Sequence, residues 1–228
     1  MKEIYIIISI ILGYLLGSIP FGIIIGKVFF HKDIREYGSH NSGGTNAGRV
    51  LGKKVGLIVI ILDALKCFLA IILNLLIYKL FFKELGNNLY SICALVTGFF
   101  VALGHCFPVW SKFNGGKAVA TIAGFIATIN PIVFLISFVV FFSVYLLTKY
   151  VSLASMSCSI FGTILCWIPF ILGSTYFPGL ILGIDYTIAI PLSFTFTTAL
   201  LVYRHKANII RMINGNENKS YLFKKKKK

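Results

Sequence analysis

The chain has 228 residues, of which 57% are hydrophobic and only 13% are charged. The hydrophobic residues fall in long blocks between short polar stretches, a pattern that excludes a soluble globular protein. The net charge of +15 would suit a nucleic-acid partner. However, the basic residues stand beside hydrophobic blocks and in the terminal run Lys224–Lys228, so we expect no nucleic-acid partner. We predict an all-α, polytopic membrane protein with one domain over residues 1–228.

Seven hydrophobic segments follow one another, and we expect each to be a transmembrane helix, because about 20 helical residues cross the hydrocarbon core. In chain order they are Ile4–Val28, Val55–Leu80, Leu89–Leu103, Ala118–Ile129, Pro131–Leu147, Val151–Leu172 and Ile184–Tyr203. Ala118–Ile129 is short and could be tilted or partly re-entrant, which leaves six crossings as the alternative. The connections around 83–88 and 173–185 look like plain turns.

Lysine and arginine are shared unevenly between the two sets of connections. With an outside N-terminus, eighteen of the 22 lie on the inner side, three (Lys2, Lys79 and Lys83) lie outside, and Lys66 falls inside a segment. Basic residues concentrate on the cytoplasmic side of membrane proteins, so we predict an outside N-terminus and a cytoplasmic C-terminus. Residues 220–228 are expected to be a disordered basic tail, although this tail could also bind anionic lipid headgroups.

The first inner loop, Gly38–Arg49, combines four glycines with hydroxyl and amide side chains and an arginine. Glycines let backbone N–H groups converge on an anion, and arginine pairs with two phosphate oxygens. A flexible connector is the alternative, but connectors rarely combine these residue types. The candidate phosphate-binding residues here are Ser39, Asn41, Gly43, Gly44, Thr45, Asn46 and Arg49.

The second inner loop carries Gly115, Gly116 and Lys117 just before a predicted helix, which also suits phosphate. It is not a Walker A loop, because the leading glycine with its four-residue spacer is missing. The third inner turn has serines at a helix start, Ser152 and Ser155, for which N-capping is the favoured reading. Past the last segment, a helix would align His205 with Asn208 at i, i+3.

Several familiar enzyme chemistries have no matching residues. No histidine is followed five residues later by aspartate, and there is no GxSxG sequence. The five cysteines have no CxxC spacing, so we expect neither a disulfide framework nor a zinc site. No other metal-ligand cluster is visible, and we expect no cofactor. Asp63 and Lys66 lie inside the second segment at i, i+3, where a neutral pair that joins helices and a role in a site are equally favoured.

The loops resemble the bacterial acyl-phosphate:glycerol-3-phosphate acyltransferase family, often called PlsY. The similarity covers nearly the whole chain and includes these matches: Gly17-Ser18-Ile19-Pro20-Phe21-Gly22, Gly38 to Arg49, Asp63-x-x-Lys66, Gly104-His105-x-Phe107-Pro108, Gly115-Gly116-Lys117, Ser152-Leu153-Ala154-Ser155, Arg204-His205-x-x-Asn208-Ile209-x-Arg211 and Asn214-Gly215-x-Glu217. The chain departs from the family pattern at four positions, where Gly, Ala, Gly and Gly are common: His40, Gly44, Cys67 and Ala118.

The resemblance implies an enzyme of the plasma membrane that transfers a fatty acyl group from acyl phosphate to the 1-hydroxyl of sn-glycerol 3-phosphate. The products would be lysophosphatidate and phosphate, the first step of phospholipid biosynthesis. By position, the substrate-contacting residues would be Ser39, Arg49, Lys117, Ser155, His205 and Asn208. The two substrates and membrane lipids are the expected partners, and we expect the monomer to function.

Acyl phosphate is already activated, so the protein needs mainly to bring two anions together and stabilise developing charge. A donor phosphate oxygen or His205 could take the hydroxyl proton. An organophosphate transporter is the main rival, but the polar residues lie at the inner boundary and no inverted repeat is found. A scaffold that senses anionic lipid would explain the lysine tail but not the glycine loops.

Overall fold

The computed structural model describes residues 1–174 and 177–220, and the part of the predicted basic tail after Ser220 lies outside them. All regular secondary structure of the described part is helical, with three short 3-10 turns and no strand. The α-helices are α1 (Lys2–Gly17), α2 (Phe21–Phe30), α3 (Gly44–Val50), α4 (Lys53–Phe81), α5 (Asn87–Cys106), α6 (Val119–Ile129), α7 (Pro131–Thr148), α8 (Val151–Ile171), α9 (Ala189–Arg204) and α10 (Lys206–Ile213).

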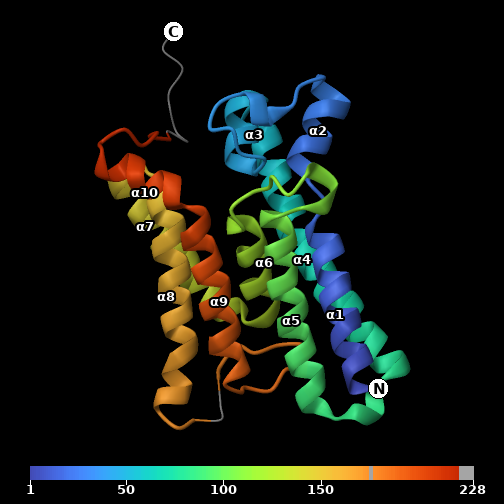
Figure 1. Cartoon of the computed structure of the whole chain (residues 1–228). Coiled ribbons are helices and arrows are strands. Elements are labelled where there is room, and N and C mark those ends of the chain that lie inside the picture. Colours follow the sequence, from blue (N-terminus) through green and yellow to red (C-terminus); the bar gives the residue numbers. More distant parts are fainter. Residues whose placement is uncertain (175–176, 221–228) are drawn as a thin grey trace.

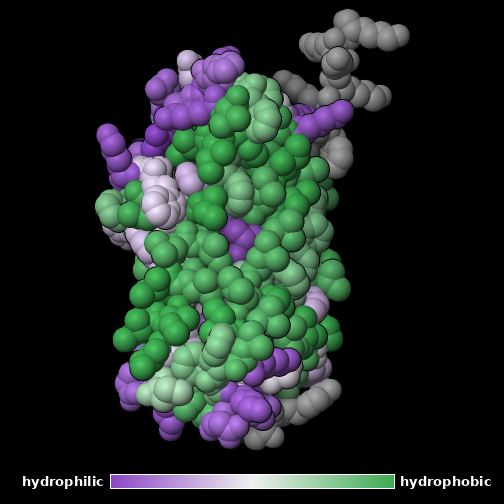
Figure 2. Space-filling view, turned by 90° about the vertical axis from the view of Figure 1, so that its right-hand side faces the viewer, coloured by the Kyte–Doolittle hydropathy of each residue, from purple (hydrophilic) through white to green (hydrophobic). Residues whose placement is uncertain are grey.

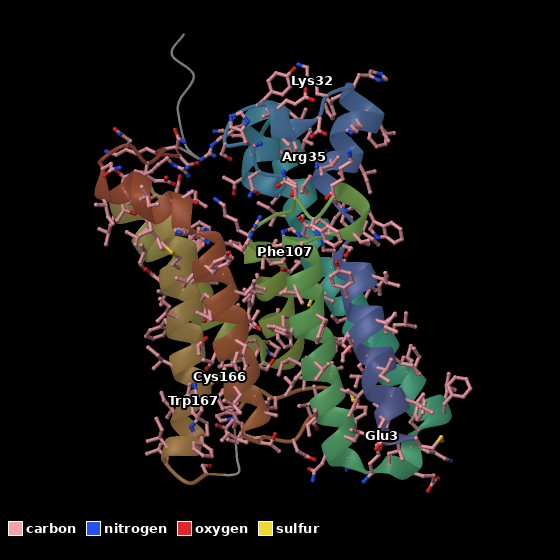
Figure 3. The ribbon with its side chains drawn as sticks, viewed as in Figure 1. Glu3, Lys32, Arg35, Phe107, Cys166 and Trp167 are labelled. Atoms are coloured by element: carbon pink, nitrogen blue, oxygen red, sulfur yellow. The ribbon has the colours of Figure 1, made fainter. Side chains whose placement is uncertain are left out.

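The long helices run roughly parallel in one bundle (Figure 1). α2, α3, α10 and the loop between α5 and α6 gather at one end, while the N-terminus lies at the other. Figure 3 shows the same polarity, with Lys32, Arg35 and Phe107 toward the first end and Glu3 near the second. The predicted inner loops therefore share one end of the molecule. We call it the loop end.

Five segments are long and apolar enough to cross a membrane: Lys2–Phe30, Lys53–Phe81, Asn87–Ser111, Pro131–Thr148 and Val151–Ile171. α6 is apolar but has 11 residues, and α9 has 16. A wide hydrophobic band separates two hydrophilic ends in Figure 2. All seven predicted segments thus contain helices, whereas the number of crossings stays a prediction.

The first predicted helix, Ile4–Val28, is interrupted, so the expectation of one continuous helix is wrong. α1 ends at Gly17 and α2 begins at Phe21. Pro20 lacks a backbone N–H and disfavours helical geometry at Ile19, and this interrupts the series of helical backbone hydrogen bonds. Gly17 also lets α1 approach α5, because an added Cβ would lie 2.3 Å from the carbonyl oxygen of Val101.

The connection between α8 and α9 is not the plain turn that the sequence suggested. Phe177 and Ile184 are buried in the main hydrophobic core. The N–H of Ile181 donates to the carbonyl of Ile129 at the end of α6, with the two atoms 3.2 Å apart. The Tyr90 hydroxyl donates to the carbonyl of Leu182 at 2.7 Å. This connection therefore folds inward and packs against the end of the short helix α6.

Candidate active site

Asn46 holds the first loop together. Its side-chain N–H groups donate to the carbonyls of Ile34, Tyr37 and Asn41 over 2.7, 3.1 and 2.9 Å. Its Oδ1 accepts from the backbone N–H of Ser39 at 2.8 Å. Asn46 is only 1% exposed. The structure therefore gives its amide a part in shaping the loop, whereas the sequence suggested only substrate binding.

The glycines of α3 allow this helix to lie close against α4. An added Cβ on Gly44 would lie 2.5 Å from Ile60 Cγ1 and 2.8 Å from the carbonyl oxygen of Gly56. Close helix packing thus explains the glycine at position 44. Thr45 and Arg49 are exposed on this tightly packed helix. The packing of α3 against α4 therefore sets the backbone position of Arg49.

The preceding turn orients its own backbone. Asn41 Oδ1 accepts from the N–H of Gly43 at 2.9 Å, as in an Asx turn. The predicted ligands Ser39, Asn41 and Gly43 therefore lie in one connected loop.

The second loop is held between the backbone of His105 and the side chain of Arg204. The N–H of Gly116 donates to the carbonyl of His105 at 2.9 Å. On the other side, Arg204 donates from Nε to the Gly116 carbonyl and from Nη2 to the Gly115 carbonyl, both over 3.0 Å. The guanidinium of Arg204 also lies 5.0 Å from the ring centroid of Phe107. These contacts set the position of the next residue, Lys117.

Lys117 belongs to a polar cluster that joins this loop to the C-terminal helix. Its ammonium group donates to Asn208 Oδ1. Asn208 in turn donates from Nδ2 to Glu217 Oε1 at 2.6 Å. Glu217 also accepts from Ser152 Oγ and from Arg211 Nε, both at 2.8 Å. A single carboxylate thus ties α8, α10 and the C-terminal chain together.

The surroundings of Lys117 are strongly basic. Partial burial is the main reason that the pKa of Lys117 falls to about 8, and the charge of Arg211 acts in the same direction. Arg49 and Arg204 add smaller contributions, and Glu217 opposes them. Arg49 therefore lies near enough to Lys117 for their charges to interact. Around Lys117, the charges of Arg49, Arg204 and Arg211 are opposed by one carboxylate, that of Glu217, which leaves an electropositive site suited to anions.

The Glu217 carboxylate remains charged in this setting. Burial raises its pKa, but hydrogen bonds from Asn208, Ser152 and Arg211 outweigh that effect and lower the pKa overall.

His205 is buried beside this cluster, between α9 and α10. Its Nδ1 donates to the carbonyl of Leu201 at 2.8 Å, so the lone pair is assigned to Nε2. Burial lowers the pKa of His205 to about 4, and the charge of Lys117 adds to that shift. The imidazole is therefore neutral at pH 7, where it can accept a hydrogen bond or a proton.

The serines of the third turn do not cap α8, contrary to the favoured reading of the sequence. The residue that precedes this helix is Tyr150, and it makes no side-chain capping bond. Ser152 donates to Glu217, and Ser155 donates from Oγ to the carbonyl of Val151 at 2.7 Å. The reason is position, because both serines lie within the first turns, where a hydroxyl can reach a preceding carbonyl or a neighbouring chain.

The structure thus joins Lys117 directly to Asn208 and brings Arg49 and His205 within electrostatic range of Lys117. The predicted set omitted Arg204, Arg211, Glu217 and Ser152. For Arg204, Arg211 and Glu217 the signal in the sequence was the polar run after the last segment, where the two arginines flank His205 and Asn208. For Ser152 it was the serine pair of the third inner turn.

Comparisons with known proteins show which family the chain belongs to. A family model described as "Glycerol-3-phosphate acyltransferase" matches residues 7–215. A glycerol-3-phosphate acyltransferase from Staphylococcus haemolyticus (strain JCSC1435) is 40% identical over 217 residues, covering 94% of this chain and 97% of the relative. One from Staphylococcus aureus (strain Newman) is 39% identical over 214 residues, with the same coverage of both chains.

Two solved structures have the same fold. Both are crystal structures of PlsY (YgiH), an integral membrane glycerol 3-phosphate acyltransferase. The glycerol 3-phosphate form has a TM-score of 0.77 and 36% identity, covering 95% of this chain and 96% of that one. The lysophosphatidic acid form has a TM-score of 0.74 and 35% identity, covering 95% of each chain. The chain therefore belongs to the glycerol-3-phosphate acyltransferase family of integral membrane enzymes.

Proposed function

We propose that this enzyme transfers a fatty acyl group from acyl phosphate to the 1-hydroxyl of sn-glycerol 3-phosphate, giving lysophosphatidate and inorganic phosphate. The observation that carries the proposal is the cation set Arg49, Lys117, Arg204 and Arg211, in which the charges that act on Lys117 are opposed by one carboxylate, that of Glu217. Two phosphate-bearing reactants repel each other in water, and an excess of fixed positive charge offsets that repulsion. The names of the two solved relatives, which mention glycerol 3-phosphate and lysophosphatidic acid, fit this acceptor and product.

In the proposed reaction, the acceptor hydroxyl oxygen bonds to the acyl carbonyl carbon, and the bond from that carbon to the phosphate oxygen breaks. The hydroxyl proton passes to an oxygen of the departing phosphate, so no strong protein base is needed. Lys117 and Arg49 stabilise the charge that grows on the phosphate. Neutral His205 is the alternative acceptor for the proton. No cofactor enters this scheme.

The remaining predicted residues would orient the two reactants. Asn208 would align the ammonium of Lys117, to which it already bonds. The hydroxyls and backbone N–H groups of both loops would bind phosphate oxygens. The groups that would bind phosphate belong to Ser39, Asn41, Gly44, Thr45 and Gly115. Donor groups of Gly43, Asn46, Gly116 and Ser155 already bond within the protein, so these residues would hold the binding groups in place. The positioning of two reactants in one site accounts for a large part of the rate gain in reactions of this kind.

The proposal includes a topology with seven membrane crossings, an outside N-terminus and the loop end in the cytoplasm of a bacterial cell. Nearly all the basic connections belong to the loop end, in line with the positive-inside rule. α6 and α9 would be the two short crossings. The single domain would work as a monomer, because every residue of the cation set comes from one chain.

Purified protein in lipid vesicles, incubated with palmitoyl phosphate and glycerol 3-phosphate, tests the proposal. We expect equal amounts of lysophosphatidate and phosphate, and no product when palmitoyl-CoA replaces the acyl phosphate. Turnover with palmitoyl-CoA alone would contradict the donor assignment. Uptake of glycerol 3-phosphate into the vesicles without acylation would instead favour the transporter.

A further inference from the structure

Three ionisable side chains meet in the interior between α4 and α5, apart from the cation set. Lys66 Nζ lies 2.7 Å from Asp63 Oδ1 and 3.0 Å from His105 Nδ1. Asp63, Lys66 and His105 are 2%, 4% and 8% exposed, respectively. Charges in such surroundings are costly and are retained when paired or used. We call these three residues the interior triad.

The interior triad contacts the break in the first helical segment. Lys66 Nζ donates to the carbonyl of Ile19 at 2.9 Å, between the end of α1 and the start of α2. A cavity of about 10 Å³ lies beside this contact, lined in part by Ser42, Asp63 and His105. Ser42 directly precedes Gly43 in the first loop. Asp63 and His105 thus share a cavity wall with the segment that leads to α3 and Arg49.

The interior triad also contacts the second loop. The carbonyl of His105 accepts the N–H of Gly116, and an added Cβ on Gly116 would lie only 2.0 Å from His105 Nε2. Lys117 is the next residue. The ring of His105 therefore contacts both Lys66 and Gly116. Its backbone carbonyl also bonds to Gly116, in the loop that carries Lys117.

We infer that Asp63, Lys66 and His105 are positioning residues that set the placement of the Arg49 loop relative to the Lys117 loop. They act through Ile19 and Gly116 and need not touch substrate. The inference rests on the proposed acyl transfer, in which both cations serve one reaction. If the proposed acyl transfer is wrong, Asp63 and Lys66 form a neutral pair that only holds helices together.

A double variant separates positioning from stability. Lys66→Met leaves the Asp63 carboxylate buried without its partner, so the melting temperature should fall. Asp63→Asn combined with Lys66→Met removes both charges and should recover most of that loss. The double variant still lacks the Lys66 ammonium that binds the Ile19 carbonyl, so its kcat/KM should stay about tenfold to a hundredfold below wild type. Wild-type kcat/KM in the double variant would overturn the inference.

Asn74 supplies a matched control on the same helix. Its side chain is fully buried near the other end of α4, where it accepts from Tyr5 and donates to Ser9. Asn74→Leu should lower the melting temperature but leave kcat/KM near the wild-type value. An equal loss of kcat/KM in Asn74→Leu would mean that destabilisation alone explains the effect. An inactive wild-type protein would instead contradict the proposed function.

Distances between spin labels test the placement of the loops without reference to activity. Tyr37 and Trp110 are exposed, at 47% and 63%. Tyr37→Cys and Trp110→Cys can carry the labels after Cys158→Ser removes the one cysteine that is not buried. The double variant, or His105→Gln if the double variant does not fold, should shift or broaden the distance distribution, and Asn74→Leu should not. An unchanged distribution in the triad variants would overturn the inference.

Discussion

Lys117 donates a hydrogen bond to Asn208, although the two residues are 91 positions apart in the chain. The contact joins the loop before α6 to the C-terminal helix α10. It also keeps the ammonium group within range of Arg49 and Arg211, whose charges lower its pKa. An ammonium group has three donors and no acceptor, so Lys117 can bond to Asn208 and still donate to a substrate phosphate.

Removal of either central cation should nearly abolish turnover. We expect Arg49→Ala and Lys117→Ala to lower kcat by about 10²-fold to 10³-fold, the cost of losing one preorganised group at a developing charge. His205→Ala should leave measurable turnover, because donor phosphate takes the proton. Lys112→Ala, an exposed lysine in the same loop, is the control. Equal and complete loss of turnover in Arg49→Ala, Lys117→Ala and His205→Ala would contradict substrate-assisted proton transfer.

Activity should fall at alkaline pH because Lys117 loses its proton there. The pKa of Lys117 is lowered to about 8, so the ammonium form dominates below pH 8 and disappears above it. The KM for glycerol 3-phosphate should therefore rise as the pH increases through 8. Bound phosphate favours the charged form, so the corresponding fall in kcat should lie at higher pH. Lys117→Arg should remove the KM rise, and an identical profile in that variant would exclude Lys117 as its source.

His205 should stay neutral across the working range. Its pKa is lowered to about 4 by burial, so protonation sets in only near that pH. Glycerol 3-phosphate itself titrates near pH 6, as phosphate monoesters do. The comparison that isolates His205 is therefore the ratio of kcat/KM between wild type and His205→Ala. We expect a constant ratio from about pH 5.5 to 7.5. A ratio that changes with a midpoint near 6.5 would indicate an imidazole exposed to solvent.

Gly116→Ala should disrupt the second loop, since the new Cβ would lie 2.0 Å from His105 Nε2. Such overpacking typically costs about 1–3 kcal/mol, and here it would also displace Lys117. We expect a lower melting temperature and a higher KM for glycerol 3-phosphate. Gly48→Ala is the control, because its Cβ would lie 3.6 Å from Gly56 Cα, an ordinary contact. Equal effects of the two substitutions would argue against crowding at His105.

His40→Gly should stabilise the protein. His40 has a φ of 56°, a left-handed conformation that costs a residue with a Cβ atom about 1 kcal/mol. Among the residues that the structure describes, its ring bonds only to the carbonyl of Arg35, at an exposed position. We expect the melting temperature to rise by roughly 2 °C. Glu36→Gly, nearby and without positive φ, should lower it. A lower melting temperature in both variants would show that the His40 hydrogen bond stabilises the protein by more than the left-handed conformation costs.

The sequence was sufficient to predict the helical segments and the gathering of glycine loops, because hydrophobic length and basic connections follow directly from the membrane environment. It also indicated Arg49 and Lys117 as partners in one site. The break between α1 and α2 was not predicted, although Pro20 was visible, since a hydrophobic run hides a broken helix. In a membrane protein such a break is tolerated where protein groups satisfy the freed backbone, as Lys66 does for Ile19.

The sequence could not reveal which residues bond to one another within the site. Glu217 lies in a motif that matches the family, but the motif does not indicate its partners, which are Asn208, Ser152 and Arg211. Such contacts depend on how α8 and α10 pack, which composition does not encode. Gly44 shows the reverse case, because its conformational freedom suggested anion binding while its contacts with α4 give it a packing role.

The inward fold of the connection between α8 and α9 closes the far end of the bundle behind α6. Ile181 bonds to Ile129 there, and Phe125 packs against Phe194 with ring centroids 4.7 Å apart. In the proposed reaction, phosphate released at the cation set therefore returns to the compartment that supplied the glycerol phosphate. Acylation would then move no net charge across the bilayer, and its rate should not depend on the membrane potential.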